Sequence, residues 1–266
     1  MTRRLTVEEI RAYWTAQALR HGQSAAASWS DTHAMELEIR TLLDRLADDE
    51  SVLDVGCANG FTTLRLAAER PLRIRGLDYV PRMIEEAKLH LEAIRDRLRG
   101  EVEFGVGDIT ALPEPTGLYD KVIVVRVLIN LHDWERQIRA LRECARVLKP
   151  GGQLLVSEAT MQGWRKLNAL RAEWHLDEIP MPSFNTYLDQ EKVIEAAADV
   201  LECREVVDFA STYYVGTRVI KPLLMKALGD PPADAANPEM EWNRWVSLLP
   251  AAGDYGTQKL FVFKKR

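Results

Sequence analysis

The chain has 266 residues, of which 47% are hydrophobic and 28% are charged, as in an ordinary soluble globular protein. Its formal net charge of −5 at pH 7 gives no general attraction to nucleic acid or to an anionic membrane, so we expect neither as a partner. The three cysteines lie far apart, without a C-x-x-C pair, and indicate neither a disulfide framework nor a zinc site, so no metal is expected.

The sequence shows no targeting segment. The N-terminal residues reach Glu8 and Glu9 before the apolar centre of a secretory signal could form. The longest apolar stretch, residues 122–125, is interrupted at Arg126 and is far too short to span a membrane. We therefore expect a cytoplasmic protein in which the cysteines are small buried hydrophobic residues, namely Cys57, Cys144 and Cys203.

Residues 5–47 are predicted to be helical, with a break at 21–33. In the second of these helices Ile39, Leu42 and Leu46 lie on one face, which is the pattern of a helix that packs on a core. Trp29 falls in the break. It either packs on the same core or belongs to a functional cover of the site.

From Ser51 onwards apolar strands alternate with helical patterns, which predicts a parallel sheet with helices on both faces. One predicted helix opens with Pro81 and continues to Leu98, another opens with Asp133 as its N-cap, and Asp189 caps a later helix. The predicted strands cover residues 52–55, 72–77, 102–106, 121–125, 153–157 and 259–263.

The stretch VLDVGCANG at residues 52–60 joins the first of these strands to a helix. Gly56 and Gly60 let the backbone turn sharply and let a ligand approach it closely. Asp54 is unusual because a buried carboxylate needs a cation or hydrogen-bond donors. The second strand ends at Asp78, the place of a ribose-binding acid in nucleotide-binding folds. These residues form one predicted site.

A nicotinamide dinucleotide is the first ligand class to consider for such a turn. Its fingerprint is G-x-G-x-x-G, but Ala58 occupies the second glycine position here. Asp54 would repel a phosphate group and attract an ammonium or sulfonium cation. The pattern therefore favours a cationic ligand over a dinucleotide.

The motifs as a set resemble class I S-adenosylmethionine (SAM) dependent methyltransferases over residues 51–158. Besides VLDVGCANG, the matching stretches are GLDYVPRMI at 76–84, VGDITALP at 106–113 and RVLKPGGQLLVSE at 146–158. The resemblance implies an α/β fold: a Rossmann-like three-layer sandwich with a seven-stranded, mostly parallel sheet whose last strand is antiparallel. It also implies a helical lid at 1–48 and a SAM-binding methyltransferase domain at 49–266, with cap insertions at about 159–188 and 210–257.

The same resemblance implies SAM as cofactor, with S-adenosylhomocysteine (SAH) as product, and assigns the residues that bind it. Asp54 and the backbone of the glycine turn would face the cationic methionine portion, and Asp78 would accept the ribose hydroxyls. Arg126 either holds a carboxylate of the cofactor or an anionic substrate group, or forms a salt bridge. The complete cofactor set is Asp54, Gly56, Ala58, Gly60, Asp78, Tyr79, Met83, Asp108, Ile109 and Arg126.

Two residues are candidates for a catalytic base, which a hydroxyl nucleophile needs and a neutral amine does not. His132 follows the fourth strand, and Glu158 ends the fifth strand, where open α/β sheets place their sites. Each also has a structural interpretation: His132 as a packed side chain, and Glu158 as a cap or a partner in an ion pair.

A narrower resemblance, to bacterial methyltransferases of glycan or natural-product pathways, suggests where the substrate binds. It assigns Trp29, Asn168, Arg171, Asn185 and Tyr187 to the substrate side, because amides, a guanidinium and a phenol suit a polar acceptor. Hydrogen bonds in turns and caps explain the polar members of this set equally well.

The sequence thus predicts a SAM-dependent methyltransferase that acts on an oxygen, or on a nitrogen, of a small polar acceptor, as a monomer or a homodimer. Orientation of donor and nucleophile in a closed pocket would supply on the order of 7 to 11 kcal/mol. Two rivals stay open, a non-catalytic SAM-binding scaffold and a nicotinamide-dependent oxidoreductase.

Overall fold

A seven-stranded sheet forms the centre of the protein in the computed structural model, which describes residues 5–229 and 237–266. The strand order is β3-β2-β1-β4-β5-β7-β6. Strand β7 runs opposite to the other six strands of this sheet, so the predicted fold class and the antiparallel last strand are confirmed. The strands are β1 (Ser51–Val55), β2 (Arg73–Asp78), β3 (Glu101–Val106), β4 (Tyr119–Val125), β5 (Leu148–Ala159), β6 (Leu201–Val207) and β7 (Gln258–Lys265).

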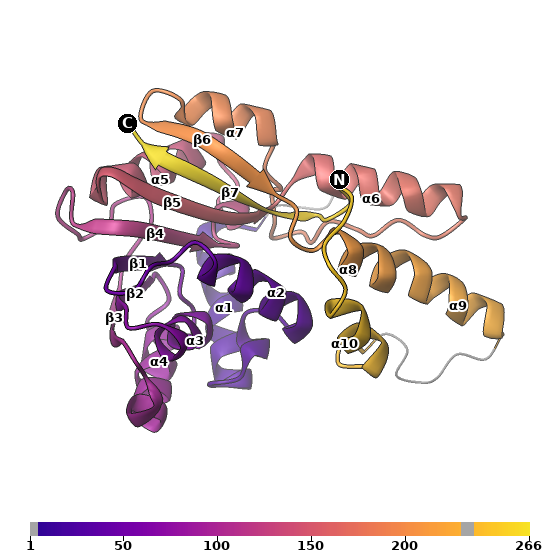
Figure 1. Cartoon of the computed structure of the whole chain (residues 1–266), viewed down its shortest axis with the longest axis horizontal. Coiled ribbons are helices and arrows are strands. Elements are labelled where there is room, and N and C mark those ends of the chain that lie inside the picture. The colour runs from indigo at the N-terminus through magenta and orange to yellow at the C-terminus, as the bar shows by residue number, and fades with distance from the viewer. Residues whose placement is uncertain (1–4, 230–236) are drawn as a thin grey trace.

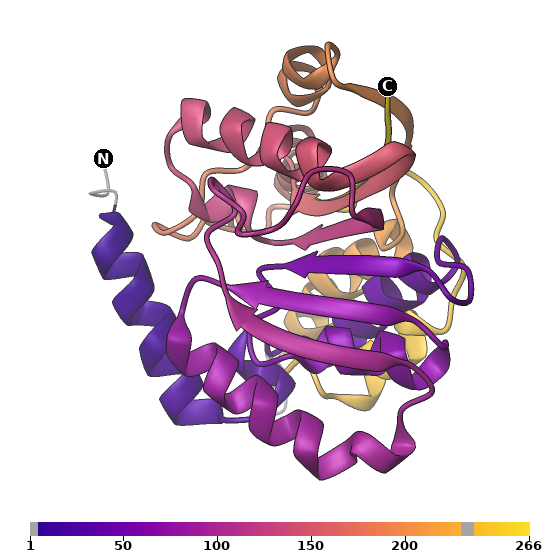
Figure 2. The same ribbon diagram turned by 90° about the vertical axis from the view of Figure 1, so that its left-hand side faces the viewer.

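Helices cover both faces of this sheet (Figure 2). One face packs on α2 (Thr32–Leu43), α3 (Phe61–Glu69) and α4 (Pro81–Ile94), whose apolar stripes share one buried core. The other face packs on α5 (Trp134–Val147) and α7 (Gln190–Ala197). Asp133 and Asp189 cap these last two helices as predicted, since their carboxylates accept the N–H groups of Glu135 and Lys192.

The N-terminal segment contains two parts that pack differently. Its first helix, α1 (Val7–His21), stands at the end of the sheet toward which the arrowheads of the purple strands point in Figure 2. A short turn, η1 (Ala25–Ala27), then leads into α2, whose Ile39 and Leu42 are fully buried beneath the sheet. The break predicted at 21–33 is confirmed. The predicted lid at 1–48 stays a prediction, and its residues 1–4 lie outside the described part of the chain.

Four later helices extend beyond the sheet on the same side of the molecule (Figure 1). They belong to the two predicted insertions, 159–188 and 210–257, although residues 230–236 of the second lie outside the described part. The helices are α6 (Met161–Glu173), α8 (Ser211–Val215), α9 (Lys221–Leu228) and α10 (Glu241–Ser247), with a π-helical turn, η4 (Gly216–Ile220), between α8 and α9.

The structure corrects four details of the sequence-based prediction. Strand β6 was not predicted; α4 ends at Ile94 and is followed by a 3-10 turn, η2 (Arg95–Arg97), instead of continuing to residue 98. Strand β5 begins at Leu148 instead of residue 153, because Leu148 already pairs with Tyr119 across an irregularity in the register. Cys203 is only partly buried, because it lies on the edge strand β6, whereas Cys57 and Cys144 are buried.

In the part of the chain that is described, no helix has the length and apolar character needed to cross a membrane.

Candidate functional site

The turn after β1 has the backbone geometry that its glycines predict. Gly56, Ala58 and Gly60 all have positive φ angles, of 78°, 48° and 77°. The N–H groups of Gly56 and Cys57 both donate to the carbonyl of Leu77, at 2.7 and 3.0 Å, which ties the turn to the end of β2. A Cβ atom added to Gly56 would lie 2.1 Å from a methyl group of Val127. Only glycine fits there.

Asp78, the last residue of β2, holds this turn in place with its carboxylate. One oxygen accepts the N–H of Ala58 at 3.0 Å, and the other accepts the N–H of Val80 at 2.9 Å. The side chain is buried, and burial raises its pKa to about 6. A carboxylate offers about four lone-pair positions, so two acceptor positions are left for a bound ligand.

Asp54 lies on the neighbouring strand and is equally buried. Its carboxylate accepts the hydroxyl of Thr63 at 2.5 Å. Burial raises the pKa of Asp54 to about 6, the hydrogen bond from Thr63 opposes that shift, and the negative charges of Asp78 and Glu38 add to it. Burying several carboxylates together costs free energy through desolvation and mutual repulsion, and a cation bound beside them would offset that cost.

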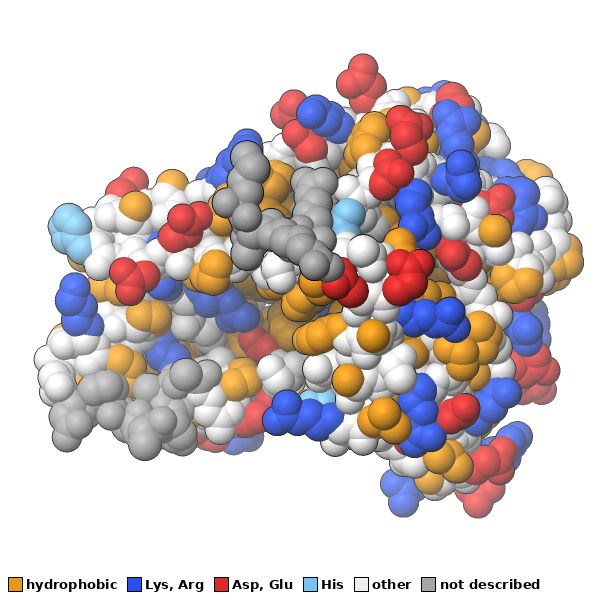
Figure 3. All heavy atoms as spheres, turned by 180° about the vertical axis from the view of Figure 1, so that it is seen from behind, with side chains coloured by type: hydrophobic (Ala, Val, Ile, Leu, Met, Phe, Trp, Pro, Cys, Tyr) orange, Lys and Arg blue, Asp and Glu red, His pale blue; other side chains and the backbone are white. Residues whose placement is uncertain are grey.

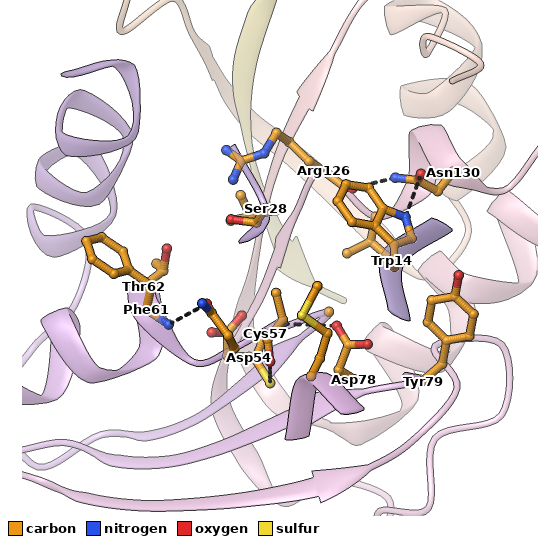
Figure 4. A pocket seen from close by; sticks show the side chains of 16 residues that line it. Trp14, Ser28, Asp54, Cys57, Phe61, Thr62, Asp78, Tyr79, Arg126 and Asn130 are labelled. Atoms are coloured by element: carbon orange, nitrogen blue, oxygen red, sulfur yellow. Dashed lines mark hydrogen bonds between the residues drawn. The ribbon is translucent and has the colours of Figure 1, made fainter. Parts of the chain in front are cut away.

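Both aspartates line one cavity, which we term the first cavity (Figure 4). Of the predicted cofactor residues, Asp54, Gly56, Ala58, Asp78, Tyr79, Met83 and Arg126 line it. Gly60 does not, because it lies beneath the turn, where an added Cβ would come within 2.6 Å of Phe104. Trp14 of α1 and Asn130 also line it, joined by a hydrogen bond of 3.3 Å from the indole N–H.

A second cavity, lined by Asp108, Ile109 and His132 among others, adjoins the first. The two share Gly56, Tyr79, Val127 and Asn130 as walls. Asp108 accepts the N–H and the hydroxyl of Thr110, both at 2.8 Å. Nδ1 of His132 lies 3.0 Å from the hydroxyl of Thr186. His132 thus borders the second cavity together with four predicted cofactor residues, Gly56, Tyr79, Asp108 and Ile109.

Arg126 is held between the first cavity and a third cavity, which lies between α1, α6 and the residues around η4. Its Nη1 donates to Glu38 at 2.5 Å, and its guanidinium lies 4.6 Å above the ring of Trp29. Glu38 is fully buried and also accepts the hydroxyl of Ser157 and the amide N–H of Gln258, at 2.5 and 3.1 Å. The salt bridge considered for Arg126 therefore exists, and the guanidinium also borders both cavities.

Glu158 lies in the core instead of at a cavity surface. Its Oε1 accepts the N–H groups of Val127 and Leu128, at 2.7 and 2.6 Å, and its side chain is completely buried. Burial raises the pKa of Glu158 to about 8, although these N–H groups oppose the shift. We infer that Glu158 holds the loop after β4 in place.

We expect Glu158→Gln to fold normally and to keep its activity, because an amide oxygen can accept the same two N–H groups. The raised pKa means that the native state keeps a proton which the unfolded state releases above its ordinary value of 4.5. Native stability from this group therefore falls as the pH rises from about 5 to 8, and the glutamine variant should not show that loss. Calorimetric melting across this pH range measures the difference.

Glu158→Ala is the matched comparison, since it leaves two buried N–H groups without an acceptor, at a cost of about 1 to 3 kcal/mol each. A glutamine variant that stays folded but loses its activity about 100-fold would instead make Glu158 a catalytic base.

The third cavity lies between α1, α6 and the residues around η4. Figure 3 shows this face of the molecule hollowed, with hydrophobic side chains gathered in the hollow. Trp29, Asn185 and Tyr187 of the predicted substrate set line it. Asn168 and Arg171 do not. The side chain of Asn168 accepts the N–H of Ile179 at 2.9 Å and donates to the carbonyl of Ile179 at 3.2 Å. Arg171 donates to the carbonyls of Asp177 and Arg218.

Sequence reasoning missed several residues that shape these cavities. Glu38 interrupts the buried stripe of α2 beside Met35 and Ile39, and a carboxylate in an apolar stripe is a signal that could have identified it. Asn130 and Arg218 gave no such signal, because they come from distant parts of the chain. Among residues 5–229 and 237–266, no group of three His, Cys, Asp or Glu is placed to hold a metal ion.

Residues 52–152 match the protein family described as a methyltransferase domain. An O-methyltransferase of Pyrenophora dematioidea is 29% identical over 177 residues, which cover 66% of this chain and 63% of that protein. This chain spans 48 to 63% of the length of the first three curated relatives that it matches. These matches confirm the resemblance predicted from the motifs.

Solved structures match over almost the whole chain. Magnesium protoporphyrin IX methyltransferase of Synechocystis PCC 6803, with bound SAH, has a TM-score of 0.61 at 13% identity and covers 97% of this chain and 98% of its own. The [4+2]-cyclase SpnF has a TM-score of 0.60 at 21% identity and covers 98% of this chain and 97% of its own. The fold is therefore that of the class I SAM-dependent methyltransferases.

Proposed function

We propose that this protein binds SAM in the first and second cavities and transfers its methyl group to an oxygen or nitrogen of a small molecule held in the third cavity. The observation that carries the proposal is the meeting of Asp54, Asp78 and the glycine turn in one cavity. The match of residues 52–152 to a methyltransferase domain and the SAH bound to the Synechocystis enzyme support it.

The residues present suit the parts of this cofactor. Asp54 and Asp78 pair with no Lys or Arg among the described residues, so these buried carboxylates suit an ammonium and a sulfonium group, and the two remaining acceptor positions of Asp78 suit ribose hydroxyls. Tyr79 and Gly56 border both cavities, so an adenosine could extend from the first into the second, between Met83 and Ile109. Asp108 is available there for an exocyclic amine.

When bound, SAM would supply a methyl group already activated by its positively charged sulfur. The protein's own residues then have to bind the donor and the acceptor, orient them toward each other and exclude water. Trp14, Ser28, Arg126 and Asn130 line both the first and the third cavity, which makes them the boundary across which the two reactants would meet. Orientation of this kind can contribute on the order of 7 to 11 kcal/mol. Neither His132 nor Glu158 lines the third cavity, so we assign no general base.

Isothermal titration with SAM, SAH and NADH tests the binding part of the proposal, and transfer of a labelled methyl group to a panel of hydroxylated and amino compounds tests the reaction. Binding of SAM and SAH but not NADH is expected. Tight NADH binding would favour an oxidoreductase. SAM binding without transfer to any compound would favour a scaffold, or another reaction on the same fold, as the cyclase SpnF illustrates.

The affinity for SAM should weaken as the pH falls below about 6. The pKa values of Asp54 and Asp78 are both raised to about 6, so these carboxylates become neutral below that pH and lose their attraction for a cation. One titrating group gives up to about tenfold per pH unit. Titrations at several pH values between 5 and 7.5 measure this slope, and SAH, which lacks the sulfonium charge, should show a smaller one. An affinity for SAM that is constant across the range would contradict the placement of the cation.

A further inference from the structure

The third cavity has a volume of about 510 Å³, which is within the range of small-molecule sites. Seven aromatic residues line it: Tyr13, Trp14, Trp29, Trp164, Phe184, Tyr187 and Tyr214. Several of these rings pack on one another, with Tyr13 and Phe184 stacked at 4.9 Å and Trp164 meeting Tyr187 edge-on at 6.4 Å. Packed rings form rigid, flat walls, which suit a planar aromatic molecule.

The charged groups in this wall all have the same sign. Arg20, Arg126 and Arg218 line the cavity, and none of the described residues that line it is Asp or Glu. Arg20 is exposed, and no carboxylate of the described residues pairs with it. Arg126 and Arg218 are paired with carboxylates outside the lining, so Arg20 supplies the uncompensated positive charge that attracts an anion.

Two of the three arginines are each held in place by a carboxylate and an aromatic ring. Arg218 donates to Asp31 at 2.8 Å and lies 4.4 Å above the ring of Tyr214, as Arg126 is held by Glu38 and Trp29. Asp31 also accepts the N–H of Ala34 and the hydroxyl of Tyr213. Since each guanidinium has five N–H donors and the carboxylates are shared with other partners, donors remain for a ligand in the cavity.

One further polar atom at this cavity has no hydrogen-bond partner among the residues that the structure describes. The side-chain oxygen of Asn185 is buried at this cavity and accepts no hydrogen bond from the described residues. A buried acceptor without a donor is costly, so a hydroxyl or amine of a bound molecule would satisfy it.

We infer that the acceptor is a planar aromatic acid, bound between the aromatic walls with its anionic group on Arg218, Arg126 and Arg20 and a hydroxyl or amine donor on Asn185. This inference rests on the proposed function and narrows its small acceptor to one chemical class. An arginine–carboxylate contact in such a site is frequently bidentate and about twice as strong as a neutral hydrogen bond.

The test compares a hydroxynaphthoate with the hydroxynaphthamide of the same substitution, which has nearly the same shape but no charge. Calorimetric titration of the SAH-saturated full chain at about pH 7 should give at least tenfold tighter binding of the acid. In Arg20→Gln, and in the double variant Asp31→Asn with Arg218→Gln, which removes both charges of that pair, this preference should fall below threefold. Arg142→Gln is the matched control, since Arg142 lies on α5 and pairs with Asp199, away from the cavity.

The outcomes separate the two proposals. Equal binding of acid and amide, binding of neither, or an acid preference that the cavity variants leave unchanged would overturn the inference, while SAH still binds. Because Arg20 is exposed, its variant gives this answer even if the buried double variant fails to fold. If the unmodified protein does not bind SAH, the proposed function is refuted. The preference for the acid over the amide can then be measured on the protein without SAH.

Discussion

Replacing Asp78 with alanine should weaken SAM binding by at least about 100-fold. The carboxylate has two acceptor positions for ribose hydroxyls, and hydrogen bonds to a charged group contribute about 1.5 to 3 kcal/mol each. The substitution also leaves the N–H groups of Ala58 and Val80 without their acceptor, which loosens the glycine turn after β1. Calorimetric titration with SAM and with SAH measures the loss, which should be similar for both because both carry the ribose.

Asp199→Ala is the control for this experiment. Its carboxylate is exposed and pairs with Arg142, outside the three cavities, so its removal changes the net charge equally without touching the site. Circular dichroism establishes whether the Asp78 variant is folded. A folded variant that binds SAM within about threefold of the unmodified protein would remove Asp78 from the ribose site.

The part of the site near β1 and β2 could be predicted from the sequence because its signals are local. Three apolar residues, an aspartate and two glycines within nine positions leave few conformations, and the structure shows the turn with the positive φ angles that glycines permit. Asp78 follows from the same logic, since parallel strands place their C-terminal ends at one edge of the sheet. Apolar runs between helical patterns also located six of the seven strands.

The remaining features depend on contacts that sequence patterns do not contain. Strand β6 reads LECREVV, with three charged residues, because an edge strand is exposed and therefore lacks a continuous apolar run. Trp14 meets Asn130 across 116 positions, and Glu38 meets Arg126 across 88. The roles considered for Asn168 and Glu158 were ambiguous for the same reason: amides and carboxylates satisfy backbone groups as readily as ligands, and only the fold shows which partner is near.

Gly56→Ala should have the second large effect, on stability and on cofactor binding together. A side chain at a φ of 78° is strained by roughly 1 to 2 kcal/mol, and the new Cβ would meet the methyl group of Val127 at 2.1 Å. Overpacking of this kind adds typically 1 to 3 kcal/mol. Because Gly56 borders both the first and the second cavity, any relief of the clash must move the glycine turn or the loop after β4. We expect a clearly lower melting temperature and SAM binding weakened at least tenfold.

Gly117 offers a control that separates the two causes. Its φ of 72° is nearly the same, but an added Cβ would meet nothing within 4 Å, so Gly117→Ala carries the backbone strain without the clash. The difference in unfolding free energy between the two alanine variants therefore measures the contact with Val127, and Val127→Ala in the Gly56 variant should recover that difference but not the strain. Equal destabilisation by the two glycine substitutions would mean that the turn moves freely away from Val127. A turn with that freedom could not hold Ala58 against Asp78 in the fixed geometry on which the cofactor site depends.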